Sequence, residues 1–331
     1  MELSCSVQTY AWGKVGSSSE VARLAEGKAC REFSLKEDTN YAELWMGIHP
    51  NGPARLVLED QLLAEYIEKN PDCLGKKIEE RFGATLPFLF KVLSVNKALS
   101  IQAHPNKSHA EQLHAERPNI YKDPNHKPEI AVALTQFEGL CGFRPLEEIQ
   151  TFLQTVPELR EAVTEHQALL AATNQSYEQQ LKQAFQSLMV CSPDLLKEQL
   201  EALQSRLAAE TSSCPVSALF LRLHSQYPGD VGCFVIYFLN HLQLLPGEAM
   251  FLGPNVPHAY LSGDCVEVMA NSDNVVRAGL TPKLIDVPTL VSMLDYTCTG
   301  PLTRKFSADS ELSSDLCQEF DPPVPDFSVA R

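Results

Sequence analysis

The stretch 99-Leu-Ser-Ile-Gln-Ala-His-Pro-Asn-Lys-107 alternates apolar and polar residues and then stops at a proline. Successive side chains of a strand point to opposite faces, so we expect Ser100, Gln102 and His104 on one face and the apolar residues on the other. That face would present an amide oxygen and an imidazole from a rigid element, which suits a metal site. Pro105 cannot donate to a ladder and ends the pairing. The stretch therefore predicts a β-strand that carries ligands.

A Gln-x-His pair alone is more typical of an outward-facing polar stripe on a half-exposed strand than of a metal site, so other motifs are needed to decide. Asn125-His-Lys-Pro-Glu129 leads into the apolar run 130–134, which places a carboxylate at the entry of a second strand. Asn255-Val-Pro-His-Ala-Tyr260 follows a Pro-Gly turn and another apolar strand, and it adds an imidazole. Both motifs favour a metal site over a polar stripe.

The donor set predicted from these three segments consists of Gln102, His104, Glu129 and His258. It offers two imidazole nitrogens, one carboxylate and one amide oxygen. Such a set suits a borderline divalent ion, zinc first and then manganese, iron or cobalt. We therefore expect one metal site, assembled from segments that are far apart in the sequence.

Seven strings resemble the type I mannose-6-phosphate isomerases, also called phosphomannose isomerases, of the animal branch. They are Tyr-Ala-Trp-Gly (10–13), Ala-Glu-Leu-Trp-Met-Gly-Ile-His-Pro (42–50), Pro-Phe-Leu-Phe-Lys-Val-Leu (87–93), Leu-Ser-Ile-Gln-Ala-His-Pro (99–105), Asn-His-Lys-Pro-Glu (125–129), Val-Pro-His-Ala-Tyr (256–260) and Ser-Asp-Asn-Val-Val-Arg-Ala-Gly-Leu-Thr-Pro-Lys (272–283). The resemblance implies a cytosolic aldose–ketose isomerase with a cupin core and one zinc ion per chain. Such an enzyme interconverts mannose 6-phosphate and fructose 6-phosphate and supplies GDP-mannose synthesis and glycosylation.

Composition limits the class of protein further. The 331 residues exceed what one hydrophobic core usually holds, and 44% hydrophobic with 21% charged residues is ordinary for a globular chain. The net charge of −15 argues against nucleic acid and anionic membranes as partners. The ten cysteines form no CxxC pair, and we find no signal segment or apolar run long enough for a membrane span. The cysteines predict reduced thiols in the cytoplasm, and the resemblance implies a small phosphosugar substrate; we expect a monomer.

The pattern along the chain predicts a mainly β fold with an α insertion, which is a cupin (jelly-roll) barrel plus a helical domain. Residues 3–60 read as short strands and turns, residues 61–82 as a covering helix, and strands return from Gly232. Residues 1–150 and 231–300 would then form the two parts of the barrel. Residues 151–230 would be the helical domain, with an apolar stripe at Leu196, Leu200, Leu203 and Leu207. Residues 301–331 would be a linker toward a second β-domain that the resembling family has and this chain lacks.

Moving a proton between adjacent sugar carbons through an enediol requires a base and a group that holds the developing oxyanion. Asp273-Asn-Val-Val-Arg277 is the best candidate for an anionic ligand, together with Lys283, because arginine offers a planar fork to oxyanions. In the resembling family this arginine is the active-site arginine, and the role falls on Arg277. A structural salt bridge is the alternative.

The sequence does not decide which residue is the proton-transferring base, and the candidates all lie in motifs that match the resembling family. Glu267 and the pair His126–Lys127 rank above Asp273. Ser100 and Lys283 suit the phosphate. Lys91 lies within an apolar strand, where an unpaired charge is costly, so it forms either a buried ion pair or a substrate contact.

Two other functions compete with the isomerase. A metal-dependent cupin oxygenase would share the barrel and the histidines but would need a redox-active metal. An inactive truncated cupin protein would keep the fold without activity, and an intact ligand set argues against it.

Overall fold

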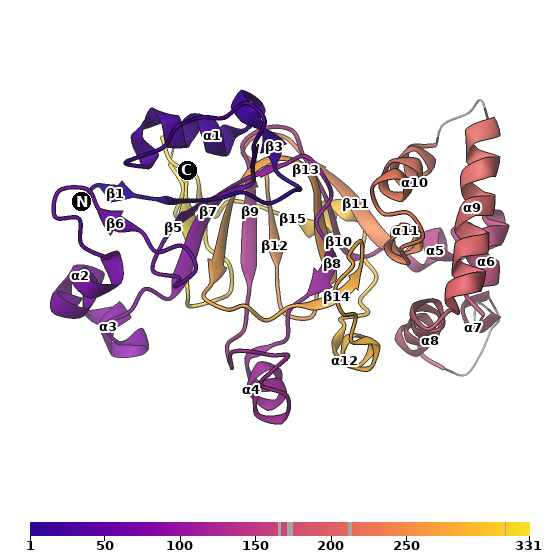
Figure 1. Ribbon diagram of the computed structural model, residues 1–331. Helices are drawn as coiled ribbons and strands as arrows, with labels where there is room; N and C mark the ends of the chain where they lie inside the picture. The colour runs from indigo at the N-terminus through magenta and orange to yellow at the C-terminus, as the bar shows by residue number, and fades with distance from the viewer. Residues whose placement is uncertain (165–166, 171–174, 211–213, 315) are drawn as a thin grey trace.

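The computed structural model describes residues 1–164, 167–170, 175–210, 214–314 and 316–331. A β-barrel of two antiparallel layers lies at its centre, with most helices gathered on one side (Figure 1). The larger layer has the strand order β15 (Lys305–Phe306), β12 (Ala249–Leu252), β9 (Glu129–Ala133), β13 (His258–Ala270), β7 (Phe88–Val95), β5 (Glu43–Met46) and β2 (Ser6–Gln8). The second layer contains β10 (Phe137–Phe143), β11 (Leu239–Leu244), β8 (Ile101–Ala103) and β14 (Val276–Gly279).

The long strand β13 joins the two layers. Its first residues, His258–Ser262, pair with β10 and β8, whereas Gly263–Ala270 pair with β7 and β9. The corner between the two layers lies at Gly263, whose φ is 108°. A Cβ atom added to this residue would lie 2.5 Å from the Gln136 carbonyl oxygen. Only glycine tolerates both constraints. The predicted fold class, a mainly β cupin barrel with an α insertion, is confirmed.

Short elements surround the barrel. The first part of the chain adds the strand pairs β1 (Leu3–Ser4) with β6 (Arg55–Leu56) and β3 (Lys14–Val15) with β4 (Asn40–Tyr41). The helices outside the insertion are α1 (Glu20–Leu24), α2 (Leu63–Lys69), α3 (Lys76–Phe82), α4 (Lys107–Glu116) and α12 (Val287–Met293). None of the described helices is long and apolar enough to cross a membrane.

The insertion consists of α5 (Leu146–Thr155), α6 (Pro157–Ala162), α7 (Gln167–Leu170), α8 (Tyr177–Met189), α9 (Pro193–Ala209), α10 (Pro215–Gln226) and α11 (Gly232–Val235). Ser192 caps α9 by accepting from the Leu195 amide, with Pro193 at the first helical position. On the predicted stripe of α9, Leu200, Leu203 and Leu207 are buried and Leu196 is partly buried. The predicted helical range 151–230 also spans residues 165–166, 171–174 and 211–213, which lie outside the described residues.

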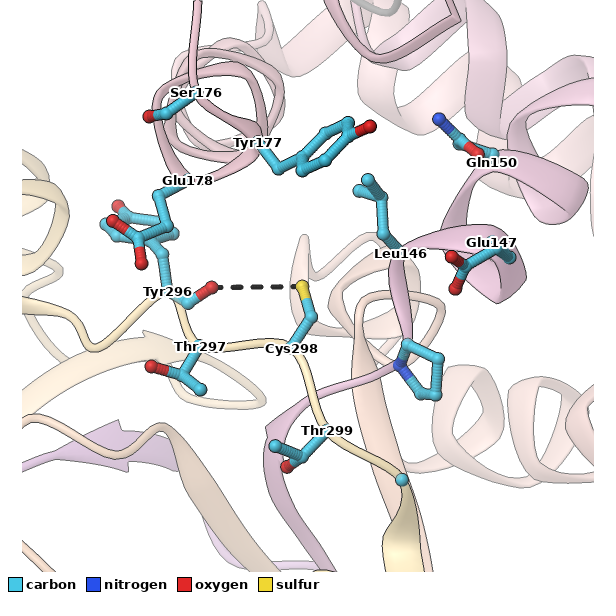
Figure 2. Close-up of a pocket in the computed structure, with 12 residues that line it drawn as sticks. Leu146, Glu147, Gln150, Ser176, Tyr177, Glu178, Tyr296, Thr297, Cys298 and Thr299 are labelled. Atoms are coloured by element: carbon cyan, nitrogen blue, oxygen red, sulfur yellow. Dashed lines mark hydrogen bonds between the residues drawn. The ribbon is translucent and has the colours of Figure 1, made fainter.

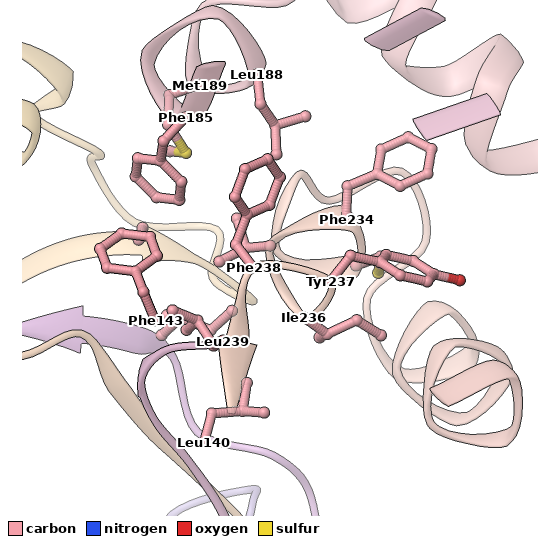
Figure 3. Close-up of a cluster of buried hydrophobic side chains, with 14 of the residues drawn as sticks. Leu140, Phe143, Phe185, Leu188, Met189, Phe234, Ile236, Tyr237, Phe238 and Leu239 are labelled. Carbon is pink, nitrogen blue, oxygen red and sulfur yellow. The ribbon is translucent and has the colours of Figure 1, made fainter. Parts of the chain in front are cut away.

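The insertion and the barrel share one hydrophobic core. Figure 3 shows Phe143 of β10 beside Phe185 of α8, whose ring also contacts Phe238. The rings of Phe143 and Phe185 lie 5.4 Å apart, edge to face. The helices are therefore packed onto the second layer and are not an independent lobe.

The segment 301–331 differs from the predicted linker. It forms a 3-10 turn at Pro301–Arg304 and the strands β15, β16 (Glu319–Phe320) and β17 (Val329–Ala330). Phe320, Phe327 and Val329 are buried against β9, β12 and β13. Its Pro, Ser and Asp content suggested an extended spacer, but apolar residues on both sides of the prolines are buried on the outer face of the sheet.

Candidate functional site

Three predicted ligands lie together inside the barrel. His104 follows β8, Glu129 begins β9 and His258 begins β13. Their nitrogen and oxygen donor atoms all lie within 4.8 Å of one another, and all three residues are buried. The Nε2 atoms of His104 and His258 lie 3.3 Å and 3.4 Å from the Oε1 and Oε2 atoms of Glu129.

The other nitrogen of each histidine is held by the backbone. His104 Nδ1 is 2.7 Å from the Asn274 carbonyl oxygen, and His258 Nδ1 is 2.8 Å from that of Val256. A carbonyl can only accept, so each Nδ1 carries the proton and each Nε2 presents its lone pair to the centre of the group. The two Nε2 atoms and Glu129 Oε2 are buried without a hydrogen-bond partner. Buried polar atoms rarely lack a hydrogen-bond partner. A bound cation would accept the lone pairs of all three atoms.

The charge states fit a metal. Burial lowers the pKa of His104 to about 4, although Glu129 opposes the shift, so the imidazole stays neutral near pH 7. Burial would raise the pKa of Glu129, but the Lys127 ammonium 3.4 Å from its Oε1 atom opposes that effect, and the pKa lies well below its usual value. Neutral imidazoles and an ionised carboxylate are the states that a divalent cation requires.

Gln102 is half-buried on the adjoining strand. It lies opposite His258 in the β8–β13 pairing and opposite Arg277 in the β8–β14 pairing. Its Oε1 accepts a hydrogen bond of 3.4 Å from Ser100 Oγ. The fourth predicted ligand thus lies beside one predicted ligand and beside the predicted active-site arginine.

A second buried group lies on β5, β7 and β13. Lys91 Nζ is 2.9 Å from Glu267 Oε2 and 3.9 Å from Glu43 Oε2, and it lies 5.2 Å from the centre of the Trp45 ring. Trp45 Nε1 donates to Glu43. Burial disfavours the Lys91 ammonium, but the carboxylates outweigh it and raise its pKa. Of the two alternatives for Lys91, the ion pair is present.

Burial raises the pKa of Glu267, against the opposing effect of Lys91 and with a further contribution from Glu129 and Glu43. From the sequence, Glu43 could be either a site residue or a paired surface group; in the structure it is buried beside Lys91. Glu43 and Trp45 stand two apart in an apolar strand and therefore share a face, but only the register of β5 against β7 brings them to Lys91.

The remaining candidate bases separate in space. Lys127 Nζ is 3.4 Å from Glu129 Oε1, whereas His126 Nε2 is 3.1 Å from Asp326 Oδ2 of the C-terminal segment. The side chains of His126 and Lys127 thus contact different carboxylates, so the predicted pair does not face one centre. The Asp273 carboxylate is largely exposed, and its hydrogen bond to His49 outweighs burial and lowers its pKa.

Arg277 on β14 is half-buried, and within the described residues its guanidinium has no carboxylate partner. Burial lowers its pKa, but an arginine keeps its charge. Among those residues, Arg277 therefore forms no structural salt bridge, which was the alternative to a ligand contact. Lys283 is exposed, and Ser100 is half-buried next to Gln102.

A separate cavity of about 690 Å³ lies between the insertion and the barrel, and its walls come from α5, α8 and residues 296–300 (Figure 2). Tyr177, Tyr296 and Cys298 are among its lining residues, and Cys298 Sγ donates to the Tyr296 carbonyl oxygen. None of the predicted site residues lines it.

Comparison with known proteins decides the family. Residues 1–146 match the family profile "Phosphomannose isomerase type I, catalytic domain", and residues 154–239 match "Phosphomannose isomerase type I, helical insertion domain". The chain is 51% identical to the mannose-6-phosphate isomerase of Homo sapiens over 342 residues, which covers 99% of this chain and 81% of the human protein. This chain belongs to the type I phosphomannose isomerase family. The resemblance recognised in the sequence is confirmed.

Solved structures of phosphomannose isomerases agree with the fold. A mannose 6-phosphate isomerase bound with zinc and yttrium superimposes with a TM-score of 0.86 at 37% identity, covering 99% of this chain and 82% of that one. A variant phosphomannose isomerase from Salmonella typhimurium superimposes with a TM-score of 0.87 at 37% identity, and the match covers 99% of this chain and 81% of that one.

Proposed function

We propose that this protein is a zinc-dependent isomerase that interconverts mannose 6-phosphate and fructose 6-phosphate by proton transfer through an enediol. The observation that carries the proposal is the buried group of His104, Glu129 and His258, whose unpartnered donor atoms converge on one point. Membership of the phosphomannose isomerase family supports the substrate, and zinc in a related structure supports the metal.

Gln102, His104, Glu129 and His258 would hold one zinc ion. When bound, zinc supplies a Lewis acid for the sugar oxygens at the reacting carbons. Asn274 and Val256 fix the tautomers of the two histidines through their carbonyl oxygens, so the ligand lone pairs need no rearrangement.

Glu267 is the base that we favour for moving the proton between the two carbons. Its pKa is raised by burial, which brings a carboxylate closer to the operating pH. The neighbouring Lys91 can hold or return a proton through the ion pair of 2.9 Å. Lys127, next to Glu129, is the second candidate, while His126 is engaged by Asp326 and Asp273 has a lowered pKa.

Arg277 is proposed to stabilise the negative charge that develops on the enediolate oxygens. Its half-buried guanidinium lies across from Gln102 and has no carboxylate partner in the described chain, so its charge is available to a ligand. Ser100, on the same face as Gln102, and the exposed Lys283 would contact the phosphate.

We also propose a cytoplasmic monomer that supplies mannose 6-phosphate for GDP-mannose synthesis and does not bind nucleic acid or membranes. The ten free cysteines and the net charge of −15 support this view. Light scattering on the purified chain tests the oligomeric state.

The proposed activity is tested by a coupled assay of fructose 6-phosphate formation from mannose 6-phosphate, combined with metal analysis. Two histidines and a carboxylate also occur in iron oxygenases, so oxygen consumption is followed in parallel. Isomerisation that requires zinc and consumes no oxygen supports the proposal. Oxygen consumption with an iron-loaded protein and no isomerisation would favour the oxygenase.

A further inference from the structure

Asp230 lies where the insertion returns to the barrel, between α10 and α11, and its carboxylate binds three backbone amides. Oδ1 accepts from Gly232 N at 2.7 Å and from Leu280 N at 2.6 Å. Oδ2 accepts from Thr281 N at 2.9 Å. Leu280 and Thr281 directly follow β14, so one side chain of the insertion fixes the backbone just beyond Arg277.

The segment that Asp230 holds has an unusual conformation. Arg277 pairs with Gln102 and Gly279 pairs with Ile101, and the register of β14 shifts between the two pairs. Such irregularities re-aim side chains. The next residues have φ values of 152° at Gly279 and 52° at Leu280. A positive φ is unfavourable for leucine and persists only where the surroundings impose it.

The backbones of the two segments are in contact. A Cβ built on Gly279 would lie 2.5 Å from Gly232 Cα, and one built on Gly232 would lie 2.5 Å from Leu280 N. No side chain can stand between them. A shift of the insertion at Asp230 would therefore be passed to the end of β14.

We propose that Asp230 is a positioning residue that holds Arg277, and Lys283 farther along the same segment, in place beside the Gln102 face of β8. The inference rests on the proposed function, because it takes Arg277 to act on the substrate. Asp230 would act through the backbone and touch neither substrate nor metal. The helical insertion thereby becomes part of the support of the substrate site.

The test compares Asp230→Ala and Asp230→Asn with wild type in the zinc-loaded enzyme. Misplacing a catalytic group by about 1 Å can cost roughly a hundredfold, so we expect kcat to fall about 10- to 100-fold in Asp230→Ala. Asp230→Asn keeps one oxygen acceptor, so its kcat should fall less than that of Asp230→Ala. Zinc content should stay at the wild-type value, because the proposed ligands lie on β8, β9 and β13 or, for His104, directly after β8, and Asp230 bonds to none of them.

Glu158→Gln is the matched control within the insertion. Glu158 accepts two hydrogen bonds of 2.7 Å from Arg206 of α9, so this variant disturbs the insertion without touching Asp230. Its melting temperature should fall while kcat and KM stay at wild-type values. Hydrogen exchange at the amides of Leu280 and Thr281 should accelerate in Asp230→Ala and not in Glu158→Gln.

The inference is overturned if folded Asp230→Ala keeps wild-type kcat, if Glu158→Gln loses kcat to the same extent, or if the loss follows zinc content. Should Asp230→Ala not fold, Asp230→Asn decides by the same criteria. A wild-type protein without isomerase activity would refute the proposed function instead. In that case, unchanged exchange at Leu280 and Thr281 in Asp230→Asn would still refute the positioning role.

Discussion

Lys91 and Glu267 form a buried ion pair with 2.9 Å between Nζ and Oε2, although they are 176 residues apart in the sequence. They stand directly opposite each other in the β7–β13 pairing, and their side chains are only 8% and 5% exposed. A buried ion pair is costly to break from one side, because the remaining charge keeps its desolvation cost without compensation.

Lys91→Met should therefore lower the free energy of unfolding by about 3–5 kcal/mol. The double variant Lys91→Met/Glu267→Gln should lose less than the sum of the two single changes, because the Glu267 charge is removed together with its partner, and the remaining Glu43 carboxylate keeps its hydrogen bond from Trp45. Urea unfolding of the four proteins provides the double-mutant cycle. Strictly additive losses would show that the two side chains do not act as a pair.

Replacing either histidine of the buried group by alanine should reduce bound zinc steeply. His104→Ala and His258→Ala each remove a nitrogen donor from the site, whereas His109→Ala on α4 removes a histidine outside it. Metal analysis after dialysis against a weak chelator measures the loss. Wild-type zinc content in both site variants would rule out this ligand set.

Arg277→Ala and Arg277→Lys should both reduce kcat more than they reduce zinc content. A lysine supplies a point charge but cannot reproduce the planar fork of a guanidinium, so the conservative change should not restore turnover. Steady-state kinetics and metal analysis of the same samples separate the two effects. Wild-type turnover in either variant would contradict the role given to Arg277.

Glu138 should make the stability depend on pH in the acidic range. Burial alone would raise its pKa, but hydrogen bonds from His241 and Arg222 lower it to about 2. The folded state thus favours the ionised carboxylate, and this stabilisation is complete above the unfolded pKa of about 4.5 and is lost as the pH falls toward 2.

Between pH 5 and pH 3, the melting temperature of the wild type should therefore fall further than that of Glu138→Gln, which has no carboxylate to protonate at this position. The variant should already be less stable at pH 7, by on the order of 2–3 kcal/mol. Differential scanning calorimetry at several pH values measures both effects. Parallel melting curves for the two proteins would show that Glu138 contributes nothing to acid unfolding.

Local patterns predicted the features that depend on local physics. The alternation around Gln102 and His104 indicated the strand β8, and the spacing of Leu200, Leu203 and Leu207 indicated a helix with a buried face. Recognisable strings then placed Glu129 and His258 with them, which distance in sequence would otherwise have hidden.

Features that depend on non-local pairing were missed. The entry of Glu43 into the Lys91–Glu267 group follows from the register of β5, β7 and β13, which no local pattern specifies. The hydrogen bonds of Asp230 and the engagement of His126 by Asp326 likewise require the folded chain. The composition of the last 31 residues concealed the few apolar side chains that bury themselves on the sheet.

The most direct test of the account is the isomerase assay on the purified chain with zinc, after removal of zinc by a chelator, and after zinc is restored. We predict conversion of mannose 6-phosphate to fructose 6-phosphate that disappears with the metal and returns with it, while His104→Ala stays inactive throughout. Equal conversion in the chelated and zinc-loaded proteins, or none in a fully zinc-loaded folded protein, would contradict the account.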